Sequence, residues 1–116
     1  MAVHKGSCHC GAVAYEVEVG LEGLIECNCS HCYRKGFVLA FAPRTAFRLT
    51  AGEEATTSYF FNHHKIDHRF CKTCGVQAFG YGVAPDGAEV AAINMRTLTD
   101  IEPWAWTAAR VDGRSF

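Results

Sequence analysis

Three cysteines lie within six residues of this chain, in the order Cys27-Asn28-Cys29-Ser30-His31-Cys32. Thiolates bind soft divalent cations, and Zn²⁺ takes them at about 2.3 Å in a tetrahedral arrangement. Three sulfur ligands leave one tetrahedral position for a small molecule, which is the arrangement that catalytic zinc sites use. The segment therefore predicts a zinc site that could perform chemistry.

The other four cysteines form two pairs, Cys8 with Cys10 and Cys71 with Cys74. Side chains at positions i and i+2 of an extended chain point to the same side, so the first pair can share an ion. The second pair has the spacing of a zinc knuckle, and the glycine that follows it, Gly75, accepts a positive φ angle. Four ligands from distant parts of the chain would make a closed structural site that helps define the fold.

Alternatives remain open on the sequence. Spacing alone would also allow Cys8 and Cys10 to join Cys29 and Cys32. A histidine could complete the central cluster into a closed site, and since thiolate-only shells are usually structural, the structural and catalytic interpretations are about evenly supported. The histidines available for this are His9, His31, His63, His64 and His68.

The positions of these histidines argue against most of them as ligands. His31 lies between two of the cysteines, where binding the same ion would strain the turn, so we expect it beside the site or exposed. His68 alternates with Ile66 and Phe70, which predicts a core histidine. His63 and His64 are expected in a loop, from which one could reach the metal.

Composition bounds the class of protein. The chain has 116 residues, 49% of them hydrophobic, and a formal net charge of −1. This balance predicts no binding to nucleic acid or to an anionic membrane surface. The N-terminal residues resemble no secretory signal and no apolar run could span a bilayer, so we expect a cytoplasmic protein. In a reducing compartment, seven cysteines, an odd number, indicate metal binding instead of disulfides.

The elements that must position the cysteines are expected to be short strands. Alternating or continuous apolar residues, bounded by Gly, Pro and polar turns, predict strands over 12–19, 24–27, 37–41, 44–50 (after a short turn), 57–61, 65–70, 76–81 and 89–94. Short helical segments are expected over 30–35, 96–99 and 104–110, the first capped by Ser30 and ended by Gly36. We therefore predict an all-β fold in a single domain, 1–116, made of small folded sheets.

The order of the cysteine motifs resembles that of the glutathione-dependent formaldehyde-activating (GFA) family, also called the centromere-protein-V-like family. The matching segments are Gly6-Ser7-Cys8-His9-Cys10-Gly11-Ala12-Val13, Cys27-Asn28-Cys29-Ser30-His31-Cys32, Phe70-Cys71-Lys72-Thr73-Cys74-Gly75, and Asn94 with Arg96, Leu98 and Asp100. Together they extend over nearly the whole chain.

The resemblance implies a β-tent fold of folded antiparallel sheets with two zinc ions. It assigns a structural zinc to Cys8, Cys10, Cys71 and Cys74, and a catalytic zinc to Cys27, Cys29 and Cys32. The reaction it implies is that of a carbon–sulfur lyase acting on a small thiol and aldehyde adduct such as S-hydroxymethylglutathione. A shell of three thiolates is a weak Lewis acid, which favours thiol binding over hydroxide generation.

Two other functions are consistent with the same residues. One is a zinc-stapled binding module without catalytic activity, and the other is a zinc–thiolate protein that releases metal on oxidation. For an enzyme, Arg34 and Lys35 could neutralise an anionic thiolate shell. Aromatic side chains could wall a pocket, although core packing is their more common role; they are Phe37, Phe60, Phe61, Trp104 and Trp106.

Overall fold

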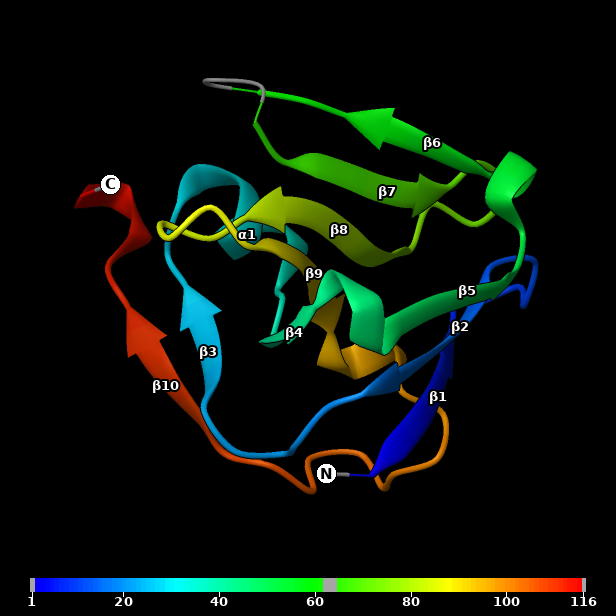
Figure 1. Ribbon diagram of the computed structural model, residues 1–116, viewed down its shortest axis with the longest axis horizontal. Coiled ribbons are helices and arrows are strands. Elements are labelled where there is room, and N and C mark those ends of the chain that lie inside the picture. Colours follow the sequence, from blue (N-terminus) through cyan, green and yellow to red (C-terminus); the bar gives the residue numbers. More distant parts are fainter. Residues whose placement is uncertain (1, 62–64, 116) are drawn as a thin grey trace.

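The computed structural model describes residues 2–61 and 65–115, and the fold is mainly β, as the sequence predicts (Figure 1). The strands are β1 (Val3–Ser7), β2 (Ala14–Glu18), β3 (Leu24–Cys27), β4 (Leu39–Pro43), β5 (Phe47–Ala51), β6 (Thr56–Tyr59), β7 (Asp67–Cys71), β8 (Gln77–Val83), β9 (Glu89–Asn94) and β10 (Ala108–Val111). The described helical elements are α1 (Ser30–Lys35) and 3₁₀ turns at Arg44–Ala46, Glu53–Ala55, Met95–Thr97 and Gly113–Ser115.

The strands form two sheets. The smaller sheet has the order β1-β2-β5, and the larger has the order β10-β3-β4-β9-β8-β7-β6. All neighbours pair antiparallel except β10, which pairs parallel to β3. In Figure 1 the chain after β10 rises beside β3 towards α1. The C-terminal segment therefore lies close to the segment that carries the central cysteines.

Aromatic side chains pack the two sheets together. Alternation along β2 places Tyr15 and Val17 in the core, where both are almost fully buried. The ring of Tyr15 stacks 5.4 Å from that of Phe47 in β5, and Phe47 lies 4.8 Å from Phe79 in β8 of the larger sheet. Burying one such side chain stabilises the fold by roughly 1.5–3 kcal/mol. The small sheet is thus held over the large one by its apolar face.

Most of the predicted elements are confirmed in place. Each of the eight predicted strands corresponds to one of β2 to β9, and α1 spans the predicted 30–35. Gly36 ends the helix with a φ of 70°, as expected. The helical segment expected over 96–99 is a single 3₁₀ turn. The cap of α1 is Cys29 and not Ser30, because the Cys29 sulfur accepts a hydrogen bond from the Cys32 amide.

Three further predictions about the fold are wrong. The segment 104–110 is not a helix, since Trp104 has a left-handed φ of 61° and Ala108–Val111 forms β10. Phe41 was expected in a strand buried on both faces but is 52% exposed. Ile66 was expected on an inner face with His68; His68 is buried, but Ile66 is 46% exposed. The loop predicted at 62–64 lies outside the described residues.

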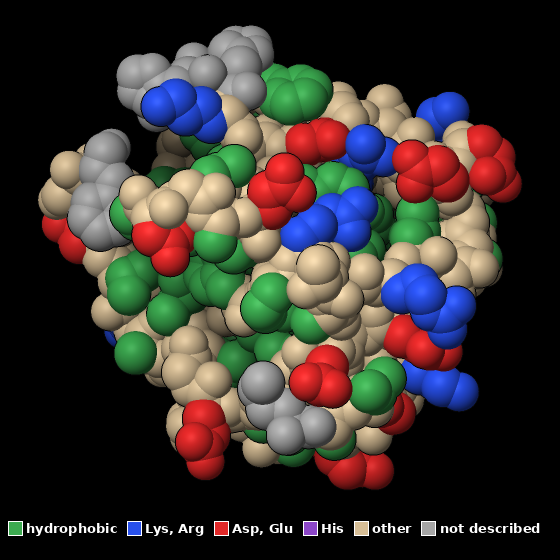
Figure 2. All heavy atoms as spheres, in the orientation of Figure 1, with side chains coloured by type: hydrophobic (Ala, Val, Ile, Leu, Met, Phe, Trp, Pro, Cys, Tyr) green, Lys and Arg blue, Asp and Glu red, His purple; other side chains and the backbone are tan. Residues whose placement is uncertain are grey.

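The surface has no extended area of one charge on the face that Figure 2 shows. Lys and Arg side chains there lie among Asp and Glu side chains, and hydrophobic side chains gather in the left half of the view. No helix in the described parts of the chain is both long and apolar enough to cross a bilayer.

Candidate metal centres

Four cysteines from the two sheets meet at one point, which we call the four-thiol cluster: Cys8, Cys10, Cys71 and Cys74. All four sulfurs lie within 4.8 Å of one another, and the Cys8–Cys10 and Cys10–Cys71 Sγ–Sγ distances are both 3.7 Å. A tetrahedron with Zn–S bonds of about 2.3 Å has edges of about 3.8 Å. The spacing of the thiols therefore fits a zinc ion without rearrangement. The pairing of the outer cysteines, which spacing left open, is as predicted.

Two similar turns carry these cysteines. The Cys8 amide donates to the Val13 carbonyl at 3.0 Å, and the Cys71 amide donates to the Val76 carbonyl at the same distance. Cys8 and Cys10 were expected on an extended segment, but they lie in a turn that follows β1. An extended chain would separate the two sulfurs more than the turn does. The knuckle geometry predicted for one pair thus applies to both.

Backbone amides point at the sulfurs of this cluster. The amides of Thr73 and Cys74 donate to Cys71 Sγ at 3.4 and 3.5 Å, and they lower the pKa of the Cys71 thiol. The amides of Val76 and Cys10 lower the pKa of Cys74 to about 6. Such hydrogen bonds favour the thiolate form, which is the form that binds a metal. Gly75 has a φ of 79°, as the zinc-knuckle spacing predicts.

The central cysteines form a separate three-thiol cluster: Cys27, Cys29 and Cys32, whose sulfurs also lie within 4.8 Å of one another. β3 delivers Cys27, and α1 positions the other two. The Cys29 amide donates to Cys27 Sγ at 3.4 Å, and the Cys32 amide donates to Cys29 Sγ at 3.3 Å. A hydrogen-bonded segment of six residues is therefore enough to gather three donors.

The three-thiol cluster cannot ionise completely without a cation. Burial, and then the neighbouring Cys29 and Cys27, raise the pKa of the Cys32 thiol. Burial also opposes ionisation of Cys29, but hydrogen bonds from the Cys32 amide and thiol outweigh it and lower the Cys29 pKa. Negative charge thus collects on one sulfur at the expense of another. A bound divalent cation would remove this conflict, so the donor set fits zinc.

Within the described residues, no further Cys, His, Asp or Glu joins the three-thiol cluster. His31, predicted beside the site or exposed, is buried, and its ring lies 4.1 Å from His68 and 5.1 Å from Phe61. Burial, then the charges of His68 and Lys35, lower the His31 pKa to about 4, so the ring is neutral near pH 7. His63 and His64 lie outside the described residues. Among the described residues, three protein donors remain for this site.

An apolar cavity of about 310 Å³, partly open to solvent and lined in part by the exposed side chains of Phe41 and Ile66, adjoins the three-thiol cluster. Its wall combines all three cysteines with residues from β3, β4, β8, β9 and the C-terminal segment. The lining residues are Ile25, Cys27, Cys29, Cys32, Phe37, Leu39, Phe41, Phe61, Ile66, His68, Gln77, Gly80, Ala92, Val111 and Gly113. Two of the aromatics expected to wall a pocket, Phe37 and Phe61, do so.

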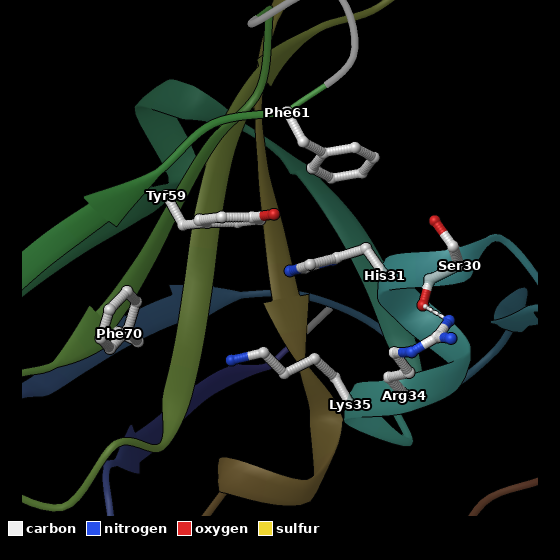
Figure 3. A pocket seen from close by; sticks show the side chains of 7 residues that line it. All are labelled: Ser30, His31, Arg34, Lys35, Tyr59, Phe61 and Phe70. Atoms are coloured by element: carbon white, nitrogen blue, oxygen red, sulfur yellow. Dashed lines mark hydrogen bonds between the residues drawn. The ribbon is translucent and has the colours of Figure 1, made fainter.

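A second, more open pocket of about 570 Å³ lies beside α1 (Figure 3). Its lining residues are Ser30, His31, Arg34, Lys35, Tyr59, Phe61 and Phe70. Figure 3 shows His31 and Lys35 extending from the helix towards the side of the pocket where Tyr59 and Phe70 lie. Lys35 lies over the Phe70 ring at 5.3 Å, and Arg34 donates to the Ser30 carbonyl. The two cations expected to neutralise the thiolate shell therefore line this pocket and not the cavity.

The C-terminal segment covers one side of the three-thiol cluster, which the sequence did not predict. Asn28 donates to Asp112 at 3.0 Å, and the Arg114 amide donates back to the Asn28 side chain at 3.1 Å. This fixes Gly113 against Cys27, so closely that a Cβ atom on Gly113 would overlap the Cys27 sulfur. A lone glycine near the end of a chain gives no signal in the sequence.

Comparisons with known proteins agree with this arrangement. The family described as glutathione-dependent formaldehyde-activating enzyme matches residues 3–110. The fold is also similar to the crystal structure of a protein from Rhodobacter sphaeroides, with a TM-score of 0.82 and 33% sequence identity over 92% of this chain and 99% of that chain. The family match covers both cysteine clusters. The chain belongs to the glutathione-dependent formaldehyde-activating enzyme family.

Proposed function

We propose that the protein is a zinc-dependent carbon–sulfur lyase that acts on a small adduct of a thiol and an aldehyde, such as S-hydroxymethylglutathione. One observation carries the proposal: the three thiols of Cys27, Cys29 and Cys32, with no fourth described protein donor, form part of the wall of an apolar cavity that is partly open to solvent. A structural zinc site has four protein ligands and no open position, so it needs no cavity beside it. Family membership supports the same reaction class.

The reaction is a reversible cleavage of a hemithioacetal, R–CH(OH)–S–R′. The carbon–sulfur bond breaks and its electron pair stays on sulfur. The hydroxyl proton ends on the thiol as the carbonyl bond forms, so that an aldehyde and a thiol are released without any redox partner. A bound zinc ion would supply a position where a thiol is held as thiolate.

The residues of this chain have two roles in that reaction. Cys27, Cys29 and Cys32 would hold the ion at one end of the cavity, with the amides of Cys29 and Cys32 fixing two of the sulfurs. The apolar wall excludes water from the reacting carbon, which strengthens electrostatic interactions there. In the four-thiol cluster, Cys8, Cys10, Cys71 and Cys74 would hold a structural ion that joins the two sheets.

The direct test is the rate of exchange between formaldehyde plus glutathione and their adduct, followed by NMR with the zinc-loaded protein. We expect exchange above the spontaneous rate with the wild type and none with Cys32→Ser. Equal exchange rates with and without the protein, for every adduct offered, would contradict the proposal and favour a zinc-stapled binding module without catalytic activity. Zinc release on mild peroxide treatment, without any exchange activity, would indicate the redox-responsive protein.

A further inference from the structure

The cavity beside the three-thiol cluster has a wall of one chemical character. Apart from the cysteines, its described lining is almost entirely aliphatic and aromatic, with no Lys, Arg, Asp or Glu. Glutathione carries two carboxylates and an ammonium group, and burying such charges without partners costs several kcal/mol each. The two cations carried by α1, Arg34 and Lys35, line the more open pocket beside that helix and not this cavity. The cavity therefore suits an uncharged group.

The volume of the cavity exceeds what formaldehyde requires. An enclosed apolar cavity of about 150 Å³ is large enough to hold benzene. The present cavity, at about 310 Å³, has room for a substituent of more carbons than a six-membered ring has. An adduct of formaldehyde would place a single carbon there and leave most of the apolar wall without a contact.

One polar group in the wall has no partner. Gln77, at the start of β8, is 6% exposed, and its Nε2 lies 3.4 Å from Nδ1 of His68. Its Oε1 is buried, with almost no surface open to the cavity, and accepts no hydrogen bond from any described residue, so the side-chain amide must turn for a ligand to reach this oxygen. An unpaired buried acceptor costs about 1–3 kcal/mol, so a ligand that supplies one donor gains by that amount. A hemithioacetal has one such donor, its hydroxyl group.

We infer that the cavity holds an apolar alkyl or aryl substituent of the adduct, and that Gln77 Oε1 accepts the hydrogen bond of the adduct's hydroxyl. The inference rests on the proposed function and names its substrate class: hemithioacetals with a substituent much larger than hydrogen or methyl. The substituent can come from the aldehyde, with a charged thiol remaining outside the cavity, or from an uncharged thiol. In either case the carbon–sulfur bond breaks as described above.

Binding of unreactive thioethers, measured by calorimetry, separates the size effect from turnover. The probes are S-methylglutathione and S-hexylglutathione in one arm, and methyl and hexyl 2-hydroxyethyl sulfide in the other. Each buried methylene strengthens binding by about fourfold, so in at least one arm the hexyl probe, with all of its additional methylenes buried, should bind about a thousandfold more tightly than the methyl probe. A gain confined to the 2-hydroxyethyl sulfides identifies an uncharged thiol, and a gain in the glutathione arm identifies a charged thiol held outside.

Ala92→Leu fills the cavity and Ala88→Leu is its control, since Ala88 is exposed and does not line the cavity. We expect Ala92→Leu to weaken binding of the hexyl probe about tenfold and to leave the methyl probe unchanged, and Ala88→Leu to change neither. Gln77→Leu should retain binding of the hexyl thioethers, which have no hydroxyl on a carbon bonded to sulfur, but lower turnover of the hexanal adduct at least tenfold. Retained thioether binding shows that the variant has kept the cavity.

Turnover of adducts made from formaldehyde and from hexanal tests the inferred substrate class separately from the proposed lyase function. Faster turnover of the hexanal adduct, with tighter binding of the hexyl probe, supports the inference. Turnover of the formaldehyde adduct alone, or equal binding of methyl and hexyl probes, overturns the inference and leaves the proposed function standing. Neither turnover nor binding in any arm overturns both.

Discussion

The two cysteine clusters use the same kind of ligand in different surroundings. The four-thiol cluster joins turns that lie 61 residues apart between Cys10 and Cys71, and it brings the small sheet to the large one. The three donors of the three-thiol cluster all come from one short segment, so an ion there would not link distant segments through its protein ligands. Its three cysteines line an apolar cavity. Both clusters consist of cysteine thiols, so the type of donor does not distinguish them. The number of donors and their surroundings distinguish a site that would stabilise the fold from a site that could bind a ligand.

The largest effect should come from breaking the four-thiol cluster. Cys71→Ser removes a ligand that is 1% exposed at the meeting point of both sheets. A structural zinc site in a small domain contributes about 10–16 kcal/mol, which is comparable with the whole stability of such a domain. We expect the variant to lose one zinc equivalent and to be largely unfolded at 25 °C, as measured by metal analysis and circular dichroism. A folded variant with full zinc content would contradict the structural role.

The matching change in the three-thiol cluster should separate activity from folding. Cys32→Ser is expected to lower catalysed exchange at least 100-fold, because the ion loses one of three protein ligands. The free energy of unfolding should fall by no more than about 2 kcal/mol, because all three ligands come from one short segment. Denaturant titration alongside the exchange assay checks both. Loss of folding together with activity would make this cluster structural as well.

A smaller effect is expected where the C-terminal segment contacts the three-thiol cluster. Gly113→Ala places a methyl group against the Cys27 sulfur and should displace either the sulfur or the segment. We expect about a tenfold loss of exchange activity, since displacing one ligand disturbs the metal geometry. The melting temperature should change by only a few degrees.

Gly82→Ala is the matched control for this variant. A Cβ atom at Gly82 meets only Ile66, at an ordinary contact distance of 3.7 Å. It should leave both activity and melting temperature as they are. Equal activity of the two variants would show that the C-terminal segment does not position the cluster.

The smallest effect concerns pH. Burial lowers the pKa of His68, with Asp67 opposing and Lys35 adding to the shift. In the unfolded chain this pKa is about 6.5, so below that pH the unfolded state binds more protons and stability falls towards the lowered folded pKa. His68→Phe keeps a ring in place but removes this titration. Between pH 7 and pH 5 its free energy of unfolding should fall less steeply than that of the wild type at equal zinc content; parallel slopes would contradict the assignment.

The sequence predicted the donors better than their surroundings. Cysteine spacing was enough to gather the thiols into three local groups, because these depend on local turns and on residue type, but it left open which of the outer groups share an ion, a pairing that spans 61 residues between Cys10 and Cys71. The prediction that Cys8 and Cys10 can share an ion fits the structure, although the local backbone is a turn and not an extended segment. Thiols within two or three residues of each other can share an ion in either geometry.

The cavity could not be predicted, because it depends on long-range pairing. Gln77 becomes part of the wall only because β8 lies beside β9 in the large sheet, and its unpaired oxygen is visible only in three dimensions. The segment that forms β10 was expected to be helical, because no local pattern reveals that its parallel partner, β3, lies 84 residues earlier in the chain. The hydrogen bond between Asn28 and Asp112, just beyond the ends of these two strands, spans the same separation. Gly113 reaches the cysteines through this same pairing.

The stoichiometry and ligands of the bound metal test the central claim most directly. We expect two zinc equivalents per chain, and X-ray absorption with an average of about 3.5 sulfur ligands per ion, the remainder being a lighter atom. Adding an excess of a small thiol should raise the sulfur average towards about four, as the open position takes the thiol. A single zinc equivalent with four sulfur ligands, or two ions with all-sulfur shells and no response to thiol, would contradict the account.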